Sequence, residues 1–256
     1  MQIGVANQSI VALRREPSES SEMVSQLLFG EKFTVIEGYK SWLRIINELD
    51  SYEGWLDIKL VELLADDQLK KLDDFKVANT LFKAKRNNSQ NPIRLCPGST
   101  LYGYKNGVFT TGINSYTSIE SPFSEFHENL SEEITRLTKT FINSPYLWGG
   151  RSPYGIDCSG LVQVVFKILG MNLPRDAGQQ VKIGETVDFI NLVQPGDLAF
   201  FDNEEEIITH VGIIIDKGKI VHSSGFVKLD TIDHQGIFNV ENQKYSHKLR
   251  VIKRII

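Results

Sequence analysis

The chain has 256 residues, of which 41% are hydrophobic and 23% are charged, and its formal net charge is −4. This length suggests two or three domains, and the composition is that of a globular protein with enough apolar residues for a core. The slight negative charge argues against nucleic acid as a partner, and no apolar run approaches the roughly 20 residues that span a bilayer. The N-terminal segment shows no signal peptide, so we expect a cytoplasmic protein, while a leader removed from a longer chain stays open.

Residues 1–70 contain short candidate strands separated by turn residues, at 10–14, 24–29, 32–37, 41–46 and 54–57. This spacing predicts a small β-barrel. The charged segment 66–74 is expected to be a linker or a short helix. Residues 71–125 again lack helical periodicity, with candidate strands at 92–95 and 108–110, and we interpret them as a second, shorter barrel-like module.

Residues 126–256 have a different pattern, with helices first and strands afterwards. Asn129 can cap a helix, with Glu132 three positions on. A second helix begins near Cys158 and is expected to stop at Gly170. Candidate strands follow at 198–201, 210–215, 220–223 and 249–255. This order predicts an α+β fold, with a largely antiparallel sheet after the helices.

Two cysteines, Cys96 and Cys158, occur in the chain, and neither is part of a C-x-x-C pair. We therefore predict no structural zinc, and we see no sign of another metal or cofactor. Cys158 falls at the first turn of a predicted helix, where the helix dipole and unpaired N–H groups favour a thiolate and lower its pKa. Its glycine-rich surroundings leave the sulfur open, and the nearby N–H groups could form an oxyanion hole. The alternative is an unreactive cysteine of the core, the role we expect for Cys96.

His210 and His222 lie on a predicted β-hairpin. A three-residue loop with Gly218 in the left-handed conformation would pair Ile215 with Lys219. That register puts His210 opposite Ser224, with His222 diagonal to it on the same face, so the two imidazoles could touch. His210 would then be the base for the thiol and His222 would orient it. A two-residue loop would instead put the histidines on opposite faces, and each histidine alone is also consistent with an ordinary structural residue.

Residues 146–162 read YLWGGRSPYGIDCSGLV and include Cys158. LPRDAGQQ follows at 173–180 and PGDLAFF at 195–201, and HVGI at 210–213 and VHS at 221–223 complete the series. In this order the motifs resemble those of the NlpC-type papain-like peptidases of the bacterial cell wall, and residues 146–162 resemble the nucleophile motif of that family. A run of this length is far more specific than a single cysteine–histidine pair.

Several roles follow from this resemblance. It implies that Cys158 attacks the amide between the γ-carboxyl of D-Glu and a diamino acid, with His210 as general base and His222 orienting it. Tyr146 matches a family tyrosine beside the nucleophile that helps to stabilise the oxyanion. The residues matched to binding of a substrate with a free N-terminal L-Ala are Asp176, Glu31, Tyr52, Asp157 and Ser159. Ala177 stands where some relatives carry serine, which removes one possible hydrogen bond to the substrate.

Segments upstream of residue 126 resemble bacterial SH3-like modules, through LFGE at 28–31, WLRI at 42–45 and YEGW at 52–55. Two such modules ahead of a peptidase domain are the layout of γ-D-glutamyl-L-diamino acid endopeptidases, also called dipeptidyl-peptidase VI. The resemblance implies a domain order of 1–70, 71–125 and 126–256. It implies murein-derived peptides such as L-Ala-γ-D-Glu-diaminopimelate as substrates, in cell-wall peptide recycling. An amidase or acyltransferase of the papain-like class, and a non-catalytic peptidoglycan-binding protein, are the alternatives.

Overall fold

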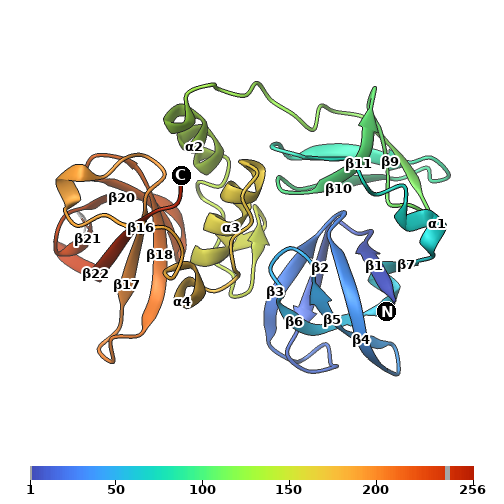
Figure 1. Ribbon diagram of the computed structural model, residues 1–256, viewed down its shortest axis with the longest axis horizontal. Helices are drawn as coiled ribbons and strands as arrows, with labels where there is room; N and C mark the ends of the chain where they lie inside the picture. The colour runs from blue at the N-terminus through green and yellow to red at the C-terminus, as the bar shows by residue number, and fades with distance from the viewer. Residues whose placement is uncertain (1, 240–242) are drawn as a thin grey trace. The chain divides into compact units, whose positions relative to one another are not determined.

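The computed structural model describes residues 2–239 and 243–256, and the chain divides into two compact units (Figure 1). Unit 1 comprises Met1–Ser124 and Lys167–Asn172, and unit 2 comprises Glu125–Phe166 and Leu173–Ile256. The predicted domain limits at residues 70 and 125 stay predictions. None of the helices in the described ranges has the length and hydrophobicity that a bilayer crossing requires.

Unit 1 begins with a seven-stranded antiparallel sheet. Its strands are β1 (Ile3–Ala6), β2 (Ile10–Arg14), β3 (Met23–Leu28), β4 (Lys32–Tyr39), β5 (Trp42–Asn47), β6 (Glu53–Asp57) and β7 (Val61–Leu64), with a 3-10 turn η1 (Ile58–Leu60) before β7. Hydrophobic side chains alternate with more exposed ones along β5, where Leu43 and Ile45 are buried. This period of two helps to explain why strands β2 to β6 could be predicted from the sequence.

A six-stranded antiparallel sheet forms the rest of unit 1, after the short helix α1 (Asp66–Leu69). Its strands are β8 (Phe75–Val77), β9 (Phe82–Arg86), β10 (Pro92–Leu95), β11 (Thr100–Lys105), β12 (Val108–Thr110) and β13 (Ser115–Ser118). Phe29 follows β3 of the first sheet, yet its ring packs edge-on against Phe109 and Tyr116, with centroids 5.7 and 5.0 Å away. The two sheets of unit 1 therefore share hydrophobic packing.

Unit 2 contains α2 (Leu130–Lys139) and all but the end of α3 (Cys158–Ile168), the two helices that the sequence predicts. A four-residue helix, α4 (Ala177–Gln180), was not predicted. Short strands β14 (Arg151–Ser152) and β15 (Gly155–Ile156) precede α3, and a 3-10 turn η2 (Ile190–Leu192) follows α4. Asn129 caps α2, because its side-chain oxygen accepts hydrogen bonds from the N–H groups of Ser131 and Glu132 at 3.0 and 3.4 Å. Gly170 follows α3 at a φ of +86°, the left-handed conformation expected of a helix stop.

The second half of unit 2 is an antiparallel sheet in the order β16-β22-β17-β18-β19-β20-β21. Its strands are β16 (Glu185–Thr186), β17 (Leu198–Asp202), β18 (Ile208–Asp216), β19 (Lys219–Ser224), β20 (Phe226–Ile232), β21 (Gly236–Asn239) and β22 (Lys244–Arg254). An additional pairing of β21 with β22 closes the sheet on itself. The expected α+β class is not confirmed, because among the described residues only α2 and α3 are longer than four residues and strands predominate.

Candidate active site

Cys158 is the first residue of α3, and a close approach of two backbone segments fixes its position. A Cβ on Gly160 would lie 2.2 Å from the carbonyl oxygen of Gly150, so only glycine fits there. The Cys158 sulfur accepts hydrogen bonds from the N–H groups of Ser159 and Val211. Because Val211 follows His210 on β18, the thiol lies against the strand that carries the predicted base.

The expectation of a lowered pKa for Cys158 is wrong for the free protein. Burial, followed by the charge of Asp157, raises the pKa of the Cys158 thiol to about 11. The N–H groups of Val211 and Ser159, and Arg175, act in the opposite direction, but they do not outweigh the loss of solvation. The Cys158 thiol is therefore neutral near neutral pH, and as a nucleophile it would need a base to remove its proton.

The histidine hairpin has the expected register but reaches it differently. Asp216, not Ile215, pairs with Lys219, and a bulge between Ile214 and Asp216 compensates for the shorter loop. This bulge restores the pairing of Gly212 with His222, so the two histidines still share one face. Gly218 has the predicted positive φ, at +72°.

His210 and His222 are hydrogen-bonded to each other. His210 Nε2 lies 2.8 Å from His222 Nδ1, and both residues are buried, His222 completely. On its other side, His222 Nε2 lies 3.0 Å from Oδ2 of Asp230 on β20. Burial, then the neighbouring His247 and His222, lower the pKa of His210 well below its ordinary value. At neutral pH His210 is therefore an uncharged imidazole that can accept a proton.

His247 on β22 is a third histidine in this group, to which the sequence assigned no role. Its ring stacks on that of His210, with centroids 4.2 Å apart and planes at 25°, and burial, then His222, lower its pKa to about 4. Ring nitrogens of all three lie within 4.8 Å of one another. Within this group His210 and His222 are hydrogen-bonded to each other, whereas His247 contacts His210 by ring stacking.

Tyr146 lies close enough to Cys158 for the two side chains to interact electrostatically, while its predicted role at the oxyanion stays a prediction. Burial, then the charges of Cys158 and Asp157, raise the pKa of Tyr146 to about 12. The Tyr146 N–H donates to the carbonyl oxygen of Gly225 at 2.9 Å, which fixes the residue to the turn between β19 and β20. The phenol therefore stays protonated near neutral pH and can donate a hydrogen bond next to the sulfur.

Asp157 and Ser159, which flank Cys158, are bound to a buried arginine. Arg175 Nη1 lies 3.0 Å from Asp157 Oδ1 and 2.9 Å from Ser159 Oγ, and Arg175 Nη2 bonds to Asp157 Oδ2. The Asp157 carboxylate also accepts from the N–H groups of Gly149 and Gly160 at 2.8 and 2.7 Å. These contacts hold the start of α3 in place, while the predicted substrate contacts of both residues stay predictions.

The two predicted carboxylates of the amine pocket belong to different units. Asp176 is exposed in unit 2, at the residue before α4, and its N–H donates to Gln179 Oε1 at 3.3 Å. Glu31 is buried in unit 1, and Tyr52 packs against the core of the first sheet there. A joint pocket of Asp176, Glu31 and Tyr52 stays a prediction.

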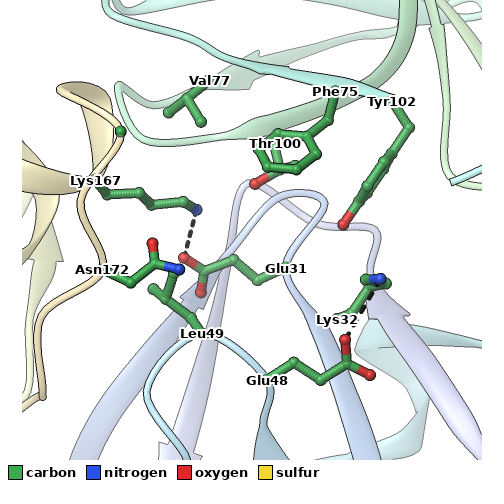
Figure 2. A pocket seen from close by; sticks show the side chains of 11 residues that line it. Glu31, Lys32, Glu48, Leu49, Phe75, Val77, Thr100, Tyr102, Lys167 and Asn172 are labelled. Carbon is green, nitrogen blue, oxygen red and sulfur yellow. Dashed lines mark hydrogen bonds and ion pairs between the residues drawn. The ribbon is translucent and has the colours of Figure 1, made fainter. Parts of the chain in front are cut away.

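Glu31 lines a cavity of about 250 Å³ within unit 1 (Figure 2). Figure 2 shows its carboxylate directed at Lys167, whose Nζ lies 2.7 Å from Glu31 Oε1. Lys167 Nζ also donates to the carbonyl oxygen of Gly98 at 2.7 Å, and Glu31 Oε2 accepts from the N–H of Leu28 at 3.1 Å. The charge of Glu31 is therefore already balanced by Lys167 in the free protein.

The raised pKa of Cys158 predicts how the rate of thiol alkylation depends on pH. In a Cys96→Ser background, so that Cys158 is the only cysteine, we expect the rate of alkylation by iodoacetamide to keep rising toward a pH of about 11. The reason is that only the thiolate reacts, and burial disfavours it. The rate is measured by mass spectrometry of the alkylated protein. A plateau already at neutral pH would contradict the prediction and indicate a preformed thiolate–imidazolium pair.

Two family models match parts of the chain, one in each unit. The NlpC/P60 family model matches residues 143–250, and the model of the bacterial dipeptidyl-peptidase Sh3 domain matches residues 13–59. The second match lies in the first sheet of unit 1, and a second SH3-like module at 71–125 stays a prediction. A crystal structure of an NlpC/P60 family protein from Bacillus cereus has a TM-score of 0.81 at 18% identity and covers 99% of both chains, which shows the shared fold.

Two curated relatives extend over most of the chain. The gamma-D-glutamyl-L-lysine dipeptidyl-peptidase of Bacillus subtilis is 32% identical over 215 residues, which are 78% of this chain and 71% of that protein. Dipeptidyl-peptidase 6 of Lysinibacillus sphaericus is 26% identical over 253 residues, which are 87% of this chain and 89% of that protein. With these relatives and the matched residues around Cys158 and the two histidines, the chain belongs to the NlpC/P60 family and carries a bacterial dipeptidyl-peptidase Sh3 domain upstream.

Proposed function

We propose that the protein is a cysteine peptidase that hydrolyses the bond between γ-D-Glu and the diamino acid of cell-wall peptides with a free N-terminal L-Ala. Its role would be the recycling of murein peptides. The observation that carries this proposal is the position of the Cys158 thiol against β18, the strand of His210, whose Nε2 is hydrogen-bonded to Nδ1 of His222 on β19 at 2.8 Å. The names of the two curated relatives support the choice of substrate.

The reaction would follow the acyl-enzyme route. His210 takes the proton from the Cys158 sulfur as the sulfur attacks the γ-carbonyl carbon of D-Glu. The Tyr146 hydroxyl donates to the oxyanion that forms. The amine of the diamino acid leaves with the proton from His210, and water then hydrolyses the thioester with His210 acting as base again. Because Cys158 and His210 are both neutral at the start, the buried site does not have to hold a thiolate–imidazolium ion pair before the substrate binds.

Recognition of the free amine is the second part of the proposal. An ammonium group that leaves water needs a carboxylate partner, and Asp176 is an exposed candidate in unit 2. Glu31 would take part only if the substrate amine shares or replaces the ion pair with Lys167. Tyr52, Asp157 and Ser159 would complete the surroundings of the L-Ala residue.

The proposal is tested by mass spectrometry of cleavage products. L-Ala-γ-D-Glu-meso-diaminopimelate and its L-Lys counterpart are each compared with the same peptide acetylated at the N-terminus. Cleavage after D-Glu in the free-amine peptides alone supports both the reaction and the amine requirement. Equal cleavage of the acetylated peptides retains the peptidase and discards the amine pocket. Absence of cleavage in all four peptides contradicts the proposal and favours an amidase, a transferase or a binding protein.

Substitution of the predicted amine-binding carboxylates gives a sharper prediction. We expect Asp176→Asn to raise KM for the free-amine peptide by about tenfold with little change in kcat, because one charge-assisted hydrogen bond is lost. Asp188→Asn, another exposed aspartate of unit 2, is the matched control. An unchanged KM in Asp176→Asn would show that the amine is bound elsewhere.

Glu31 is tested separately, because its ion pair with Lys167 gives it a structural role as well. We expect Glu31→Gln to raise KM for the free-amine peptide. If an acetylated peptide is cleaved at all, its cleavage should not change. Glu48→Gln is the control, since Glu48 lines the same cavity and pairs with Lys32 at 3.4 Å. If Glu31→Gln lowers only the unfolding temperature, the role of Glu31 is limited to stabilising unit 1.

A further inference from the structure

Asp230 on β20 is a largely buried carboxylate behind the catalytic histidines that the sequence did not single out. Its Oδ2 lies 3.0 Å from His222 Nε2 and 3.6 Å from Lys228 Nζ. The Asp230 side chain is 17% exposed, and that of His222 is fully buried. Asp230 therefore ends a continuous series of contacts that runs through His222 to His210.

These contacts determine which ring nitrogens carry hydrogen. An ionised carboxylate can only accept, so Nε2 of His222 has to be the donor to Asp230. In neutral His222, Nδ1 is then a bare acceptor, and the nitrogen 2.8 Å away, Nε2 of His210, has to be the donor to it. A neutral His210 that carries hydrogen on Nε2 has its lone pair on Nδ1.

We propose that Asp230 is a positioning residue of the catalytic centre, which acts through His222 to hold His210 in the tautomer whose Nδ1 can accept a proton. This inference rests on the proposed function, in which His210 is the base for Cys158. In the proton transfer, the hydrogen moves from the Cys158 sulfur to His210 Nδ1, and the electron pair of the broken S–H bond stays on the sulfur.

The groups around Asp230, His222 and His210 favour the ionised form of Asp230. The hydrogen bond from His222 lowers the pKa of Asp230, and Lys228 acts in the same direction. The charged and titratable groups that face His210 and His222 are Lys228 and Asp230 on β20 and His247 on β22. With Asp230 removed, Nε2 of His222 would lose its acceptor while Lys228 stayed nearby. Both tautomers of His222, and hence both of His210, would then become accessible.

The experiment compares Asp230→Ala, Asp230→Asn and the control Asp188→Asn in the full chain. The amide side chain in Asp230→Asn would offer an oxygen acceptor without the charge, so this variant separates the hydrogen bond from the electrostatic effect. kcat and KM are measured on the free-amine peptide, and ¹⁵N NMR of labelled histidines reports the tautomer of each ring. Thermal unfolding identifies any variant that fails to fold, and Asp230→Asn then carries the test.

We expect both catalytic rings to carry hydrogen on Nε2 in the unmodified protein and in Asp188→Asn. Asp230→Ala should lower kcat by between about tenfold and a hundredfold with KM nearly unchanged, less than the roughly 10⁴-fold seen where an acid bonds directly to the base. Its His210 should show a mixture of tautomers, and Asp230→Asn should recover part of both effects. Unaltered tautomers with kcat within about twofold in folded Asp230→Ala or Asp230→Asn would overturn the inference. If Cys158→Ala retained activity, the proposed function itself would fail, independently of Asp230.

Discussion

Replacing Cys158 with alanine is expected to abolish turnover, by a factor on the order of 10⁴ or more, because no other group can form the thioester. The loss should appear in kcat. The Cys158→Ala protein should still bind the uncleaved free-amine peptide, because the side chains assigned to recognition are intact. Single-turnover kinetics by mass spectrometry and calorimetric titration of the peptide measure these two effects.

Cys96→Ala is the matched control for this substitution. Cys96 is also buried, and burial also raises the pKa of its thiol to about 11, but it lies in unit 1 among structural contacts such as that with Ser9 Oγ at 3.6 Å. We expect activity close to that of the unmodified protein. Turnover that survives in Cys158→Ala would exclude Cys158 as the nucleophile, and equal losses in both variants would indicate a folding defect.

The parts of the site that could be predicted from the sequence depend on local rules. Asn129 and Gly170 mark helix ends through side-chain capping and a positive φ, and both are present in the structure. The histidine register was predictable because a hairpin turn restricts pairing to a few possibilities. The bulge near Ile215 lay outside that reasoning, since it depends on how β18 packs rather than on the turn alone.

The rest depends on distant parts of the chain. Asp230 and His247 reach the histidines only because β20 pairs with β19 and β22 returns to pair with β17 and β21, an order that the separate strand patterns do not specify. The pKa of Cys158 also needed the structure, because the helix terminus is visible in sequence whereas burial and the charge of Asp157 are not. Arg175 lies seventeen residues after Cys158, and the sequence indicates only that it belongs to the motif LPRDAGQQ, not that it pairs with Asp157.

Arg175→Met is expected to be the most destabilising of the substitutions considered, because it removes the partner of a buried carboxylate. The side chains of Arg175 and Asp157 are 1% and 7% exposed, and breaking such a pair from one side costs about 3–5 kcal/mol. Asp157 would keep its backbone N–H donors, but its charge would lose the guanidinium. Because the bonded atoms include Ser159 Oγ, the start of α3 should loosen and kcat should fall with stability.

The control is Arg15→Met, which breaks an exposed pair with Glu22, whose side chains are 62% and 38% exposed, and which should cost less than about 1 kcal/mol. Since the two units need not unfold together, hydrogen–deuterium exchange of α3 peptides is a better measure than a single melting temperature. Adding Asp157→Asn to Arg175→Met should recover part of the lost protection, because the unpaired charge is then gone. If α3 is as well protected in Arg175→Met as in Arg15→Met, the ion pair does not hold Cys158 in place. The close contact between Gly150 and Gly160 would then have to position Cys158 without it.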